Sequence, residues 1–346
     1  MKPSILLTLT ATAASTSAFT LPFKFLRNTV STEASNTNTP NHRLLHSPPT
    51  NVVGNARGRI KAASTINNRP SFLRAGSYLP YHPPAATPDH PNLNQDMIQS
   101  VTGSLIIPAI SMPVSGPTAG NSVGEYSASL WVGIDGASAT DSFTHPIANA
   151  TCNPLAASLR AGVDIFWDGT LGGQQTPYVW AQWYPAEHAR GFLDFKAAPG
   201  DELRFTVTTG PHGNSGGGVL VENYGPPQSP KGVDGRVKIP IATGSLIWKD
   251  MPPLCSAQAS WILEDFPLQE RPELPSALGN FTDVRFSEMG FATWLGGNFT
   301  GEDVLGKDKL KMLEIYDAGQ GGTLAKCKTD GEGERKSVVC SRVVEA

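Results

Sequence analysis

The chain has 346 residues, of which 39% are hydrophobic, and a formal net charge of −3. Beyond the N-terminus no segment is long and apolar enough to cross a bilayer, which argues against a membrane-spanning protein. The acidic balance argues against nucleic acid as a partner, because phosphate backbones attract basic surfaces.

Residues 1–18 have the pattern of a secretory signal peptide. Lys2 precedes an apolar run from Ile5 to Ala14, and small residues surround Ala18. We therefore expect a secreted, extracellular protein that is soluble after cleavage, and we expect it to be a monomer.

Residues 19–95 differ sharply from the rest of the chain. They are rich in Pro, Asn, Ser, Thr and His, and they carry eight Lys or Arg against two acids, a net of +6. Residues 96–346 carry 18 Lys or Arg against 28 acids, a net of −10. One interpretation is a disordered basic tail. We favour a largely disordered pro-segment that docks on the acidic domain as an intramolecular inhibitor and loosens as carboxylates protonate in acid.

Residues 96–346 form the domain that we expect to fold. Their apolar runs are short and alternating, and turn residues separate many of them. This pattern predicts an antiparallel all-β sandwich or barrel with little helix. The runs are SASLWVGID, YVWAQWYP, LRFTVTT, GGVLVENY, GRVKIPIATGSLIW and SVVCSRVV.

Four cysteines in a secreted chain predict two disulfides, with three possible connectivities. Cys327 and Cys340 flank an expected hairpin, which favours their pairing and leaves Cys152 to pair with Cys255. Three N-x-T sequons predict glycosylation: Asn149, Asn280 and Asn298.

We assign no function to the GNSGG segment or to the histidines. The sequence GNSGG at 213–217 resembles the nucleophile loop of serine peptidases, but it lies between two strand-like runs, where a plain hairpin loop accounts for it. The seven histidines are scattered and show no ligand spacing. We therefore expect neither a metal nor a cofactor.

The segment WILEDF at 261–266 sets two carboxylates among apolar residues. Read as a strand, it places one acid on each face. The two faces are Ile262, Glu264 and Phe266, and Trp261, Leu263 and Asp265. A carboxylate among Ile and Phe loses hydration, which is costly unless the group is paired or used.

Four blocks in order resemble those of the eqolisins, acid-active glutamic peptidases that are secreted mainly by filamentous fungi. The blocks are SLWVGIDG (129–136), AGVDIFWDG (161–169), YVWAQWYPAE (178–187) and WILEDF (261–266). The resemblance covers about residues 98–346 and includes the positions of Cys152 and Cys255. It implies a concanavalin-like or jelly-roll-like sandwich of two antiparallel sheets that hydrolyses polypeptide substrates without a metal or a covalent intermediate.

The resemblance makes Glu264 the catalytic glutamate and gives Asp265 a structural role on the opposite face. A partly desolvated glutamate can take a proton from water and return it to the leaving amine. The resemblance also implies a set of residues that shape the cleft and hold the catalytic strand: Trp131, Asp135, Asp164, Trp180, Gln182 and Phe266.

The catalytic glutamine of the family is replaced by Arg160 in the block LRAGVD. A glutamine donates and accepts and is neutral, whereas an arginine only donates and is charged. Arg160 can stabilise an oxyanion, but within hydrogen-bonding range it favours the ionised form of Glu264 and lowers the pKa of that carboxyl by roughly 1–3 units. An ion pair between them favours an inactive protein, whereas Arg160 turned away from Glu264 favours activity.

Three other functions stay open from the sequence. The chain can be a catalytically impaired relative that still binds peptides. It can be a glycan-binding sandwich that uses Trp131, Trp180 and Trp183. It can be a glycoside hydrolase, provided that Glu264 and Asp164 face one cleft about 5–10 Å apart.

Overall fold

The structure, a computed structural model, describes most of the chain after residue 67. The described residues are 68–71, 74–92, 95–114, 116, 124–137, 143–145, 150–169, 171–192, 194–210, 215–227, 239–265, 267–268, 271–275, 277–305, 310–317, 322–331 and 337–343. The chain divides into two units, residues 1–38 and 39–346, and every described residue lies in the second unit. The predicted signal peptide lies outside the described residues.

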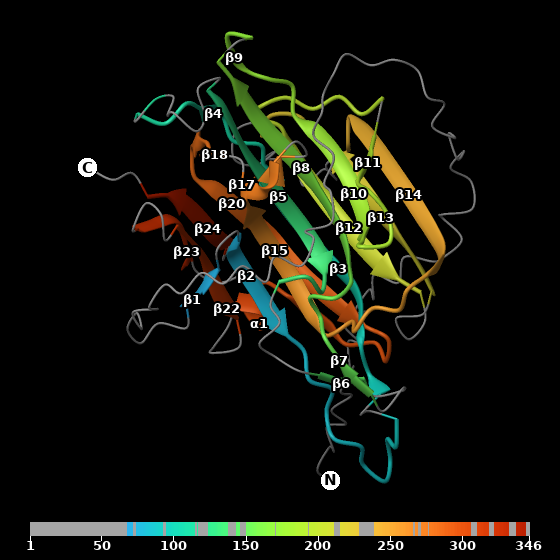
Figure 1. The fold of residues 1–346 in the computed structure, drawn as a ribbon. Helices are drawn as coiled ribbons and strands as arrows, with labels where there is room; N and C mark the ends of the chain where they lie inside the picture. The colour runs from blue at the N-terminus through green and yellow to red at the C-terminus, as the bar shows by residue number, and fades with distance from the viewer. Residues whose placement is uncertain are drawn as a thin grey trace, which may run out of the picture. The chain divides into compact units, whose positions relative to one another are not determined.

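Two β-sheets make up nearly all of the regular structure (Figure 1). The first sheet, in order of pairing, is β1 (Asn68–Ser71), β22 (Lys311–Asp317), β2 (Arg74–Pro80), β15 (Gln258–Glu264), β5 (Glu125–Ile134), β8 (Ser158–Asp168), β10 (Tyr178–Tyr184) and β11 (Arg190–Gly191). The second sheet is β23 (Gly322–Asp330), β24 (Ser337–Arg342), β20 (Val284–Thr293), β3 (Ile98–Ile106), β12 (Glu202–Thr209), β13 (Ser215–Asn223) and β14 (Ala242–Met251).

Short elements complete the fold. β9 (Gly173–Gln174), β18 (Ala277–Leu278) and β21 (Asn298–Thr300) extend β8, β5 and β20. Three small ladders join β4 (Ile110–Ser111) to β19 (Asn280–Phe281), β6 (Phe143–His145) to β7 (Ala150–Cys152), and β16 (Pro267–Leu268) to β17 (Arg271–Pro275). The helix α1 (Glu302–Leu305) has one turn, and among the described residues no helix is long and apolar enough to span a membrane.

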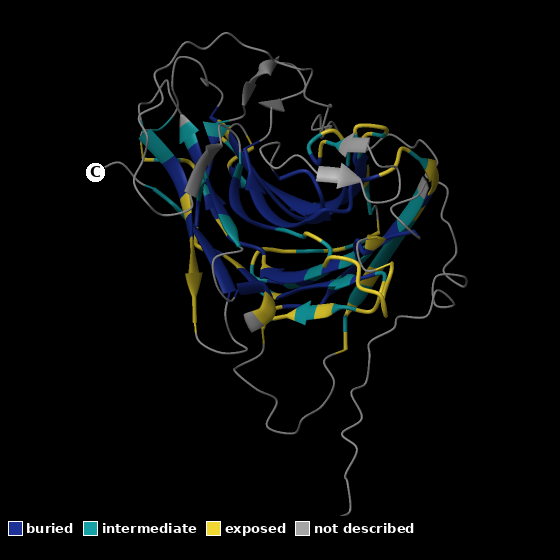
Figure 2. Cartoon of the chain, turned by 90° about the horizontal axis from the view of Figure 1, so that it is seen from below, coloured by how far each residue is buried: buried dark blue, intermediate teal, exposed yellow. Residues whose placement is uncertain are grey.

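The predicted antiparallel β-sandwich is confirmed. All pairings within the two sheets are antiparallel except β1 with β22 and β18 with β5. The sheets are continuous through the hairpin of β22 and β23, and buried residues line both layers (Figure 2). In β15 the residues facing the second sheet are Ala259, Trp261 and Leu263, which belong to the core between the sheets.

A glycine makes room for the central tryptophan of this core. The Trp261 Nε1 donates to the carbonyl oxygen of Thr102 in β3 at 2.8 Å. A Cβ on the neighbouring Gly103 would lie 2.7 Å from the Trp261 indole, so a larger residue there would push the sheets apart. Trp261 thus fixes which face of β15 points inward, and with it the outward face that carries Glu264.

The folded sheet begins before residue 96, in the stretch assigned to a largely disordered pro-segment. Residues 74–80 form β2, which pairs with β15 on one side and β22 on the other (Figure 1). Its residues 75–79 are buried. The folded domain therefore starts further upstream than the sequence pattern predicts, because the prolines after Leu79 hide the alternation of a short strand. Removal of an upstream pro-segment stays a prediction.

Both predicted disulfides are present. Cys152 bonds Cys255, which ties the end of β7 to the segment before β15. Cys327 and Cys340 sit directly opposite each other in the β23–β24 hairpin and are bonded. Of the predicted glycosylation sites, Asn298 is exposed and Asn280 is partly buried, with its amide 3.4 Å from the Ser111 Oγ. Asn149 lies outside the described residues, and glycosylation stays a prediction.

Candidate active site

Glu264 lies at the end of β15 on the face that points away from the second sheet, as the alternation predicts. Its side chain is only 8% exposed. Trp131 Nε1 donates to Oε2 at 2.7 Å, and Arg160 Nη1 donates to the same oxygen at 3.1 Å. Arg74 donates to Oε1 from Nε at 3.1 Å and forms an ion pair through Nη2 at 3.0 Å. Four N–H groups thus occupy the usual acceptor positions of one carboxylate.

Arg160 projects from β8 on the same face and is 4% exposed. Its Nε and Nη2 donate to Gln182 Oε1 at 3.0 and 2.7 Å, which leaves Nη1 for Glu264. Its guanidinium carbon lies 5.4, 5.6 and 5.1 Å from the ring centres of Trp131, Trp180 and Tyr184. Burial lowers the pKa of the Arg160 guanidinium, and the Glu264 carboxylate opposes that effect. The aromatic faces and the glutamate together stabilise the buried cation.

The strand register explains how these side chains meet. One cross-strand row contains Arg74, Glu264, Ser129, Asp164 and Tyr178, from β2, β15, β5, β8 and β10. In a second row, four residues away along each strand, Gln182 stands opposite Arg160. Side chains of alternate residues share a face, so the two rows lie on the same side of the sheet.

Trp131 lies between the two rows, and a glycine keeps its surroundings open. Gly162 is paired with Trp131, and a Cβ on Gly162 would lie 2.7 Å from the Trp131 Cβ. The glycine therefore lets the indole lie over β8, where it supports the Arg160 guanidinium.

Gln182 is a neutral amide that holds Arg160 rather than Glu264. Its Oε1 accepts from Arg160, and its Nε2 donates to the carbonyl oxygen of Glu187 at 2.9 Å. The Glu187 carboxylate in turn accepts from Trp248 Nε1 at 2.7 Å and pairs with Arg190 at 2.6 Å. The amide of Gln182 is thus held at both its oxygen and its nitrogen, and it fixes the direction of the guanidinium.

Asp164 is fully buried on the same face and accepts from Trp180 Nε1 at 2.7 Å. It lies two strands from Glu264, so their α-carbons are separated by about 10 Å. Glu264 and Asp164 therefore lie on one face at about the separation that a glycoside hydrolase requires of its two carboxylates. Glu264 is engaged by two arginines, however, which argues against its use as a general acid.

Asp135 directly follows β5, and its carboxylate binds the backbone at the start of β15. Its carboxylate accepts from the backbone amides of Ser256, Ala257 and Gln258 at 2.7, 2.9 and 3.0 Å. Burial raises the pKa of Asp135 to about 7, and the backbone amides oppose that effect. Asp265, the next residue after Glu264, is buried on the other face. The side chain of Phe266 lies outside the described residues.

The tryptophans do not form an exposed platform. Trp131 and Trp180 are fully buried on the Glu264 face. Trp183 faces the second sheet, where its ring centre lies 6.5 Å from that of Trp248. The expectation that Trp131, Trp180 and Trp183 together present a glycan-binding surface is wrong, because successive odd and even positions of β10 point to opposite faces.

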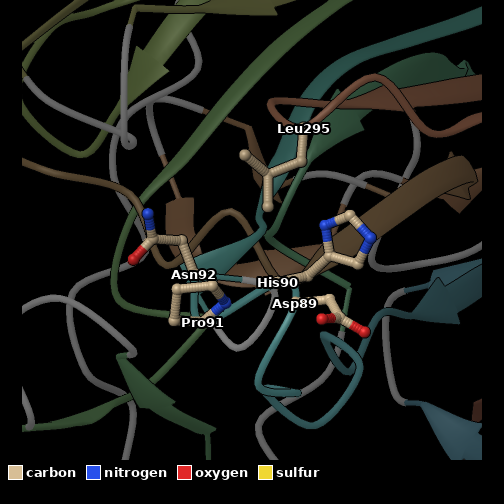
Figure 3. Close-up of a pocket in the computed structure, with 5 residues that line it drawn as sticks. All are labelled: Asp89, His90, Pro91, Asn92 and Leu295. Carbon is tan, nitrogen blue, oxygen red and sulfur yellow. The ribbon is translucent and has the colours of Figure 1, made fainter.

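A surface pocket lies elsewhere on the molecule (Figure 3). It has a volume of about 490 Å³ and is lined by Asp89, His90, Pro91, Asn92 and Leu295, none of which belongs to the Glu264 cluster. All five are exposed. Within the described part of the chain, no group of three or more His, Cys, Asp and Glu residues could hold a metal ion.

Arg74 is a residue of this site that was not predicted from the sequence. It lies in β2, next to Glu264 in the strand register, and it also donates to the carbonyl oxygen of Gly136. The segment RAGSYLP shows the alternation of a strand, but the proline-rich sequence that follows dominates its composition. The alternation marks a strand, but no signal in the sequence pairs that strand with the one that carries Glu264.

The fold and this cluster define a two-sheet sandwich with a buried glutamate on the face of the first sheet that points away from the second sheet. The model of the peptidase A4 family matches residues 90–341. Aspergillopepsin-2 from Aspergillus niger is 27% identical over 285 residues, which cover 79% of this chain and 80% of that protein. The crystal structure of scytalido-glutamic peptidase with a transition state analog inhibitor aligns with a TM-score of 0.49 and 18% identity, over 78% of this chain and 98% of that one. The chain belongs to the peptidase A4 family, the eqolisins.

Proposed function

We propose that the protein is a secreted, acid-acting endopeptidase that hydrolyses polypeptides with a water molecule activated by Glu264. Family membership supports peptide hydrolysis. One observation carries the assignment of the residues: the Glu264 Oε2 and the Arg160 Nη1 meet at 3.1 Å on the buried face of the first sheet. A proton acceptor and an N–H donor so close together can act on the same small group of a substrate.

The proposed reaction uses Glu264 twice. Glu264 takes a proton from water as the water oxygen bonds to the carbonyl carbon of the peptide. The negative charge that develops on the carbonyl oxygen is stabilised by an N–H donor. When the tetrahedral intermediate breaks its C–N bond, the amine leaves with the proton that Glu264 holds. The products are a carboxylic acid and an amine, and Glu264 is regenerated.

Arg160 supplies the N–H donor in this proposal. The guanidinium is anchored to Gln182 through Nε and Nη2, so only Nη1 needs to exchange its partner. When a peptide enters, Nη1 moves from Glu264 Oε2 to the carbonyl oxygen. That exchange frees one acceptor position on Glu264 for the attacking water.

Secretion and a zymogen stage belong to the same proposal. The predicted signal peptide and the two disulfides support export, because disulfides persist in oxidising compartments. Upstream of the described residues, the segment 19–67 keeps six Lys or Arg against one acid. A basic pro-segment of this kind would bind the acidic domain at neutral pH and release it in acid.

The experiment that tests the proposal is cleavage of an unfolded protein substrate from pH 2 to 7. The proteins compared are the parent after acid incubation, Glu264→Gln, and Asp330→Asn as a control in an exposed ion pair with Arg285. We expect the parent and Asp330→Asn to cleave in acid, and Glu264→Gln to lose at least about 1,000-fold in rate, as the loss of a catalytic group typically does. Activity retained by Glu264→Gln would contradict the proposal.

A second candidate function follows from the same ion pair. The contact of Arg160 with Glu264 is the arrangement that the sequence analysis associated with inactivity, and Arg74 adds a second guanidinium. A glutamate that accepts four N–H donors has no acceptor position left for water. The protein would then be a catalytically impaired relative that binds polypeptides.

The variant Arg160→Gln separates the two candidates. It restores the residue that the family resemblance implies at this position. If the parent is silent and Arg160→Gln cleaves, the protein is a peptidase scaffold that is disabled at one residue. If the parent cleaves and Arg160→Gln is slower, Arg160 is a working donor.

A further inference from the structure

Ser129 is a buried hydroxyl that the proposed reaction has not used. It lies in β5, directly between Glu264 of β15 and Asp164 of β8 in the strand register. It is 0% exposed, and its Oγ has no hydrogen-bond partner among the described residues. A buried polar atom without a partner costs free energy, so such an atom requires an explanation.

The two carboxylates beside Ser129 in the strand register are each held by an indole N–H group. Trp131, two residues along the same strand, fixes Glu264 through Oε2. Trp180 fixes Asp164 through Oδ1. The two indoles therefore hold one carboxylate on each side of Ser129, and the hydroxyl between these carboxylates can both donate and accept without carrying a charge.

The Ser129 hydroxyl can accept a hydrogen bond, which the Arg160 guanidinium cannot do. A water molecule beside Glu264 gives one proton to the carboxylate and needs an acceptor for its second proton. Arg160 has only donors, and the amide oxygen of Gln182 already accepts from Arg160. Ser129 Oγ is an acceptor on the same face, next to the glutamate in the register.

We infer that Ser129 is a positioning residue whose hydroxyl holds the water that Glu264 deprotonates. The inference rests on the proposed function and deepens it. The water donates one proton to Ser129 Oγ, donates its other proton to Glu264, and presents a lone pair to the peptide carbonyl. Asp164 lies on the opposite side of Ser129 and favours a hydroxyl that donates toward it, which leaves the Oγ lone pairs for the water.

The test compares three serine variants of the full chain. Ser129→Ala removes the hydroxyl, and Ser129→Thr retains it on a residue type that strands favour. Ser77→Ala is the matched control, because Ser77 Oγ is also fully buried and has no partner among the described residues. Ser77 stands opposite Trp261 and Met312, so it faces the core between the sheets rather than Glu264.

We expect Ser129→Ala to lower kcat by about 10- to 100-fold with KM within about twofold, the size of one lost hydrogen bond to a reacting group. Ser129→Thr should recover kcat to within about threefold of the parent, and Ser77→Ala should leave both constants unchanged. A kcat of Ser129→Ala that stays within about threefold of the Ser77→Ala value overturns the inference.

A crystal structure of the parent protein gives a readout that does not depend on activity. An ordered water within hydrogen-bonding distance of both Ser129 Oγ and Glu264 supports the inference. A Ser129 hydroxyl that donates to a protein oxygen, with no water beside it, overturns it. If the parent does not cleave any substrate, the proposed function fails, and the crystal structure alone then decides the role of Ser129.

Discussion

Two arginines of this protein each pair with a glutamate and lie over a tryptophan ring, but one is buried and the other is half exposed. Arg160 pairs with Glu264 and lies over Trp131, with 5% of its side chain exposed. Arg190 pairs with Glu187 and lies over Trp248, with 50% of its side chain exposed. Comparing them separates the effect of burial from the effect of the contacts themselves.

We expect Arg160→Met to lower the free energy of unfolding by about 2–4 kcal/mol, because it leaves the buried Glu264 carboxylate with one guanidinium instead of two. Arg190→Met should cost less than about 1 kcal/mol, since water replaces the contacts of an exposed ion pair. Urea unfolding of both variants and the parent measures the difference. Equal costs for the two variants would mean that the Glu264 pair adds nothing beyond an ordinary surface contact.

At the scale of single residues, part of the site could be predicted from the sequence. The alternation in WILEDF placed Glu264 and Asp265 on opposite faces, and the block LRAGVD placed Arg160 on the adjoining surface. The first is a consequence of the period of two in a strand, and the second follows from the family resemblance. Arg74 and Ser129 could not be predicted, because their positions beside Glu264 depend on which strands pair, and pairing is a long-range property.

At the scale of elements, the start of β15 is fixed by one carboxylate and one disulfide. Asp135 accepts three consecutive backbone amides there, and Cys255 bonds Cys152 immediately before them. The sequence indicated a strand at 261–266 and the disulfide, but it did not indicate this amide cluster. Asp135 has a φ of 64°, a left-handed conformation that aspartate tolerates, and the turn that it makes aims the carboxylate at β15.

The titration of Asp135 predicts how stability depends on pH. The folded state holds its pKa near 7, above the unfolded value of about 3.9, so the folded protein binds more protons between these pH values. Stability from this group is therefore complete below pH 4 and is lost as the pH rises to 7. Asp135→Asn does not titrate, so the difference in unfolding free energy between parent and variant should shrink from pH 4 to pH 7.

Asp330→Asn is the control for this measurement, since Arg285 lowers the pKa of the Asp330 carboxyl. A lowered pKa has the opposite sign: its stabilisation is present above pH 4 and is lost as the pH falls further. The difference between the parent and Asp330→Asn should therefore stay constant from pH 4 to pH 7. If the Asp135→Asn difference is also constant there, the three amides keep Asp135 ionised throughout.

At the scale of the whole molecule, the class of fold could be predicted from the sequence. The start of the folded domain could not, because β2 lies upstream of the expected boundary at residue 96. Short alternating runs identified the sandwich, because most strands of both sheets carry that pattern. The charge reversal near residue 95 suggested a boundary there, yet Arg74, one of the basic residues that produced it, is paired with Glu264 inside the first sheet. Net charge describes a segment as a whole and cannot distinguish a docked tail from a strand with a buried ion pair.

The position of β2 predicts where the mature protein begins. β2 lies between β15 and β22, so its removal would leave two unpaired strand edges and would take Arg74 from Glu264. We therefore expect N-terminal sequencing and intact mass of the secreted protein to place the mature N-terminus upstream of Arg74. A chain that starts at residue 68 should unfold cooperatively in urea, and a chain that starts at residue 96 should show no cooperative transition. A mature protein that begins at residue 96, retains no fragment containing residues 74–80 and still unfolds cooperatively would contradict the placement of β2 in the sheet.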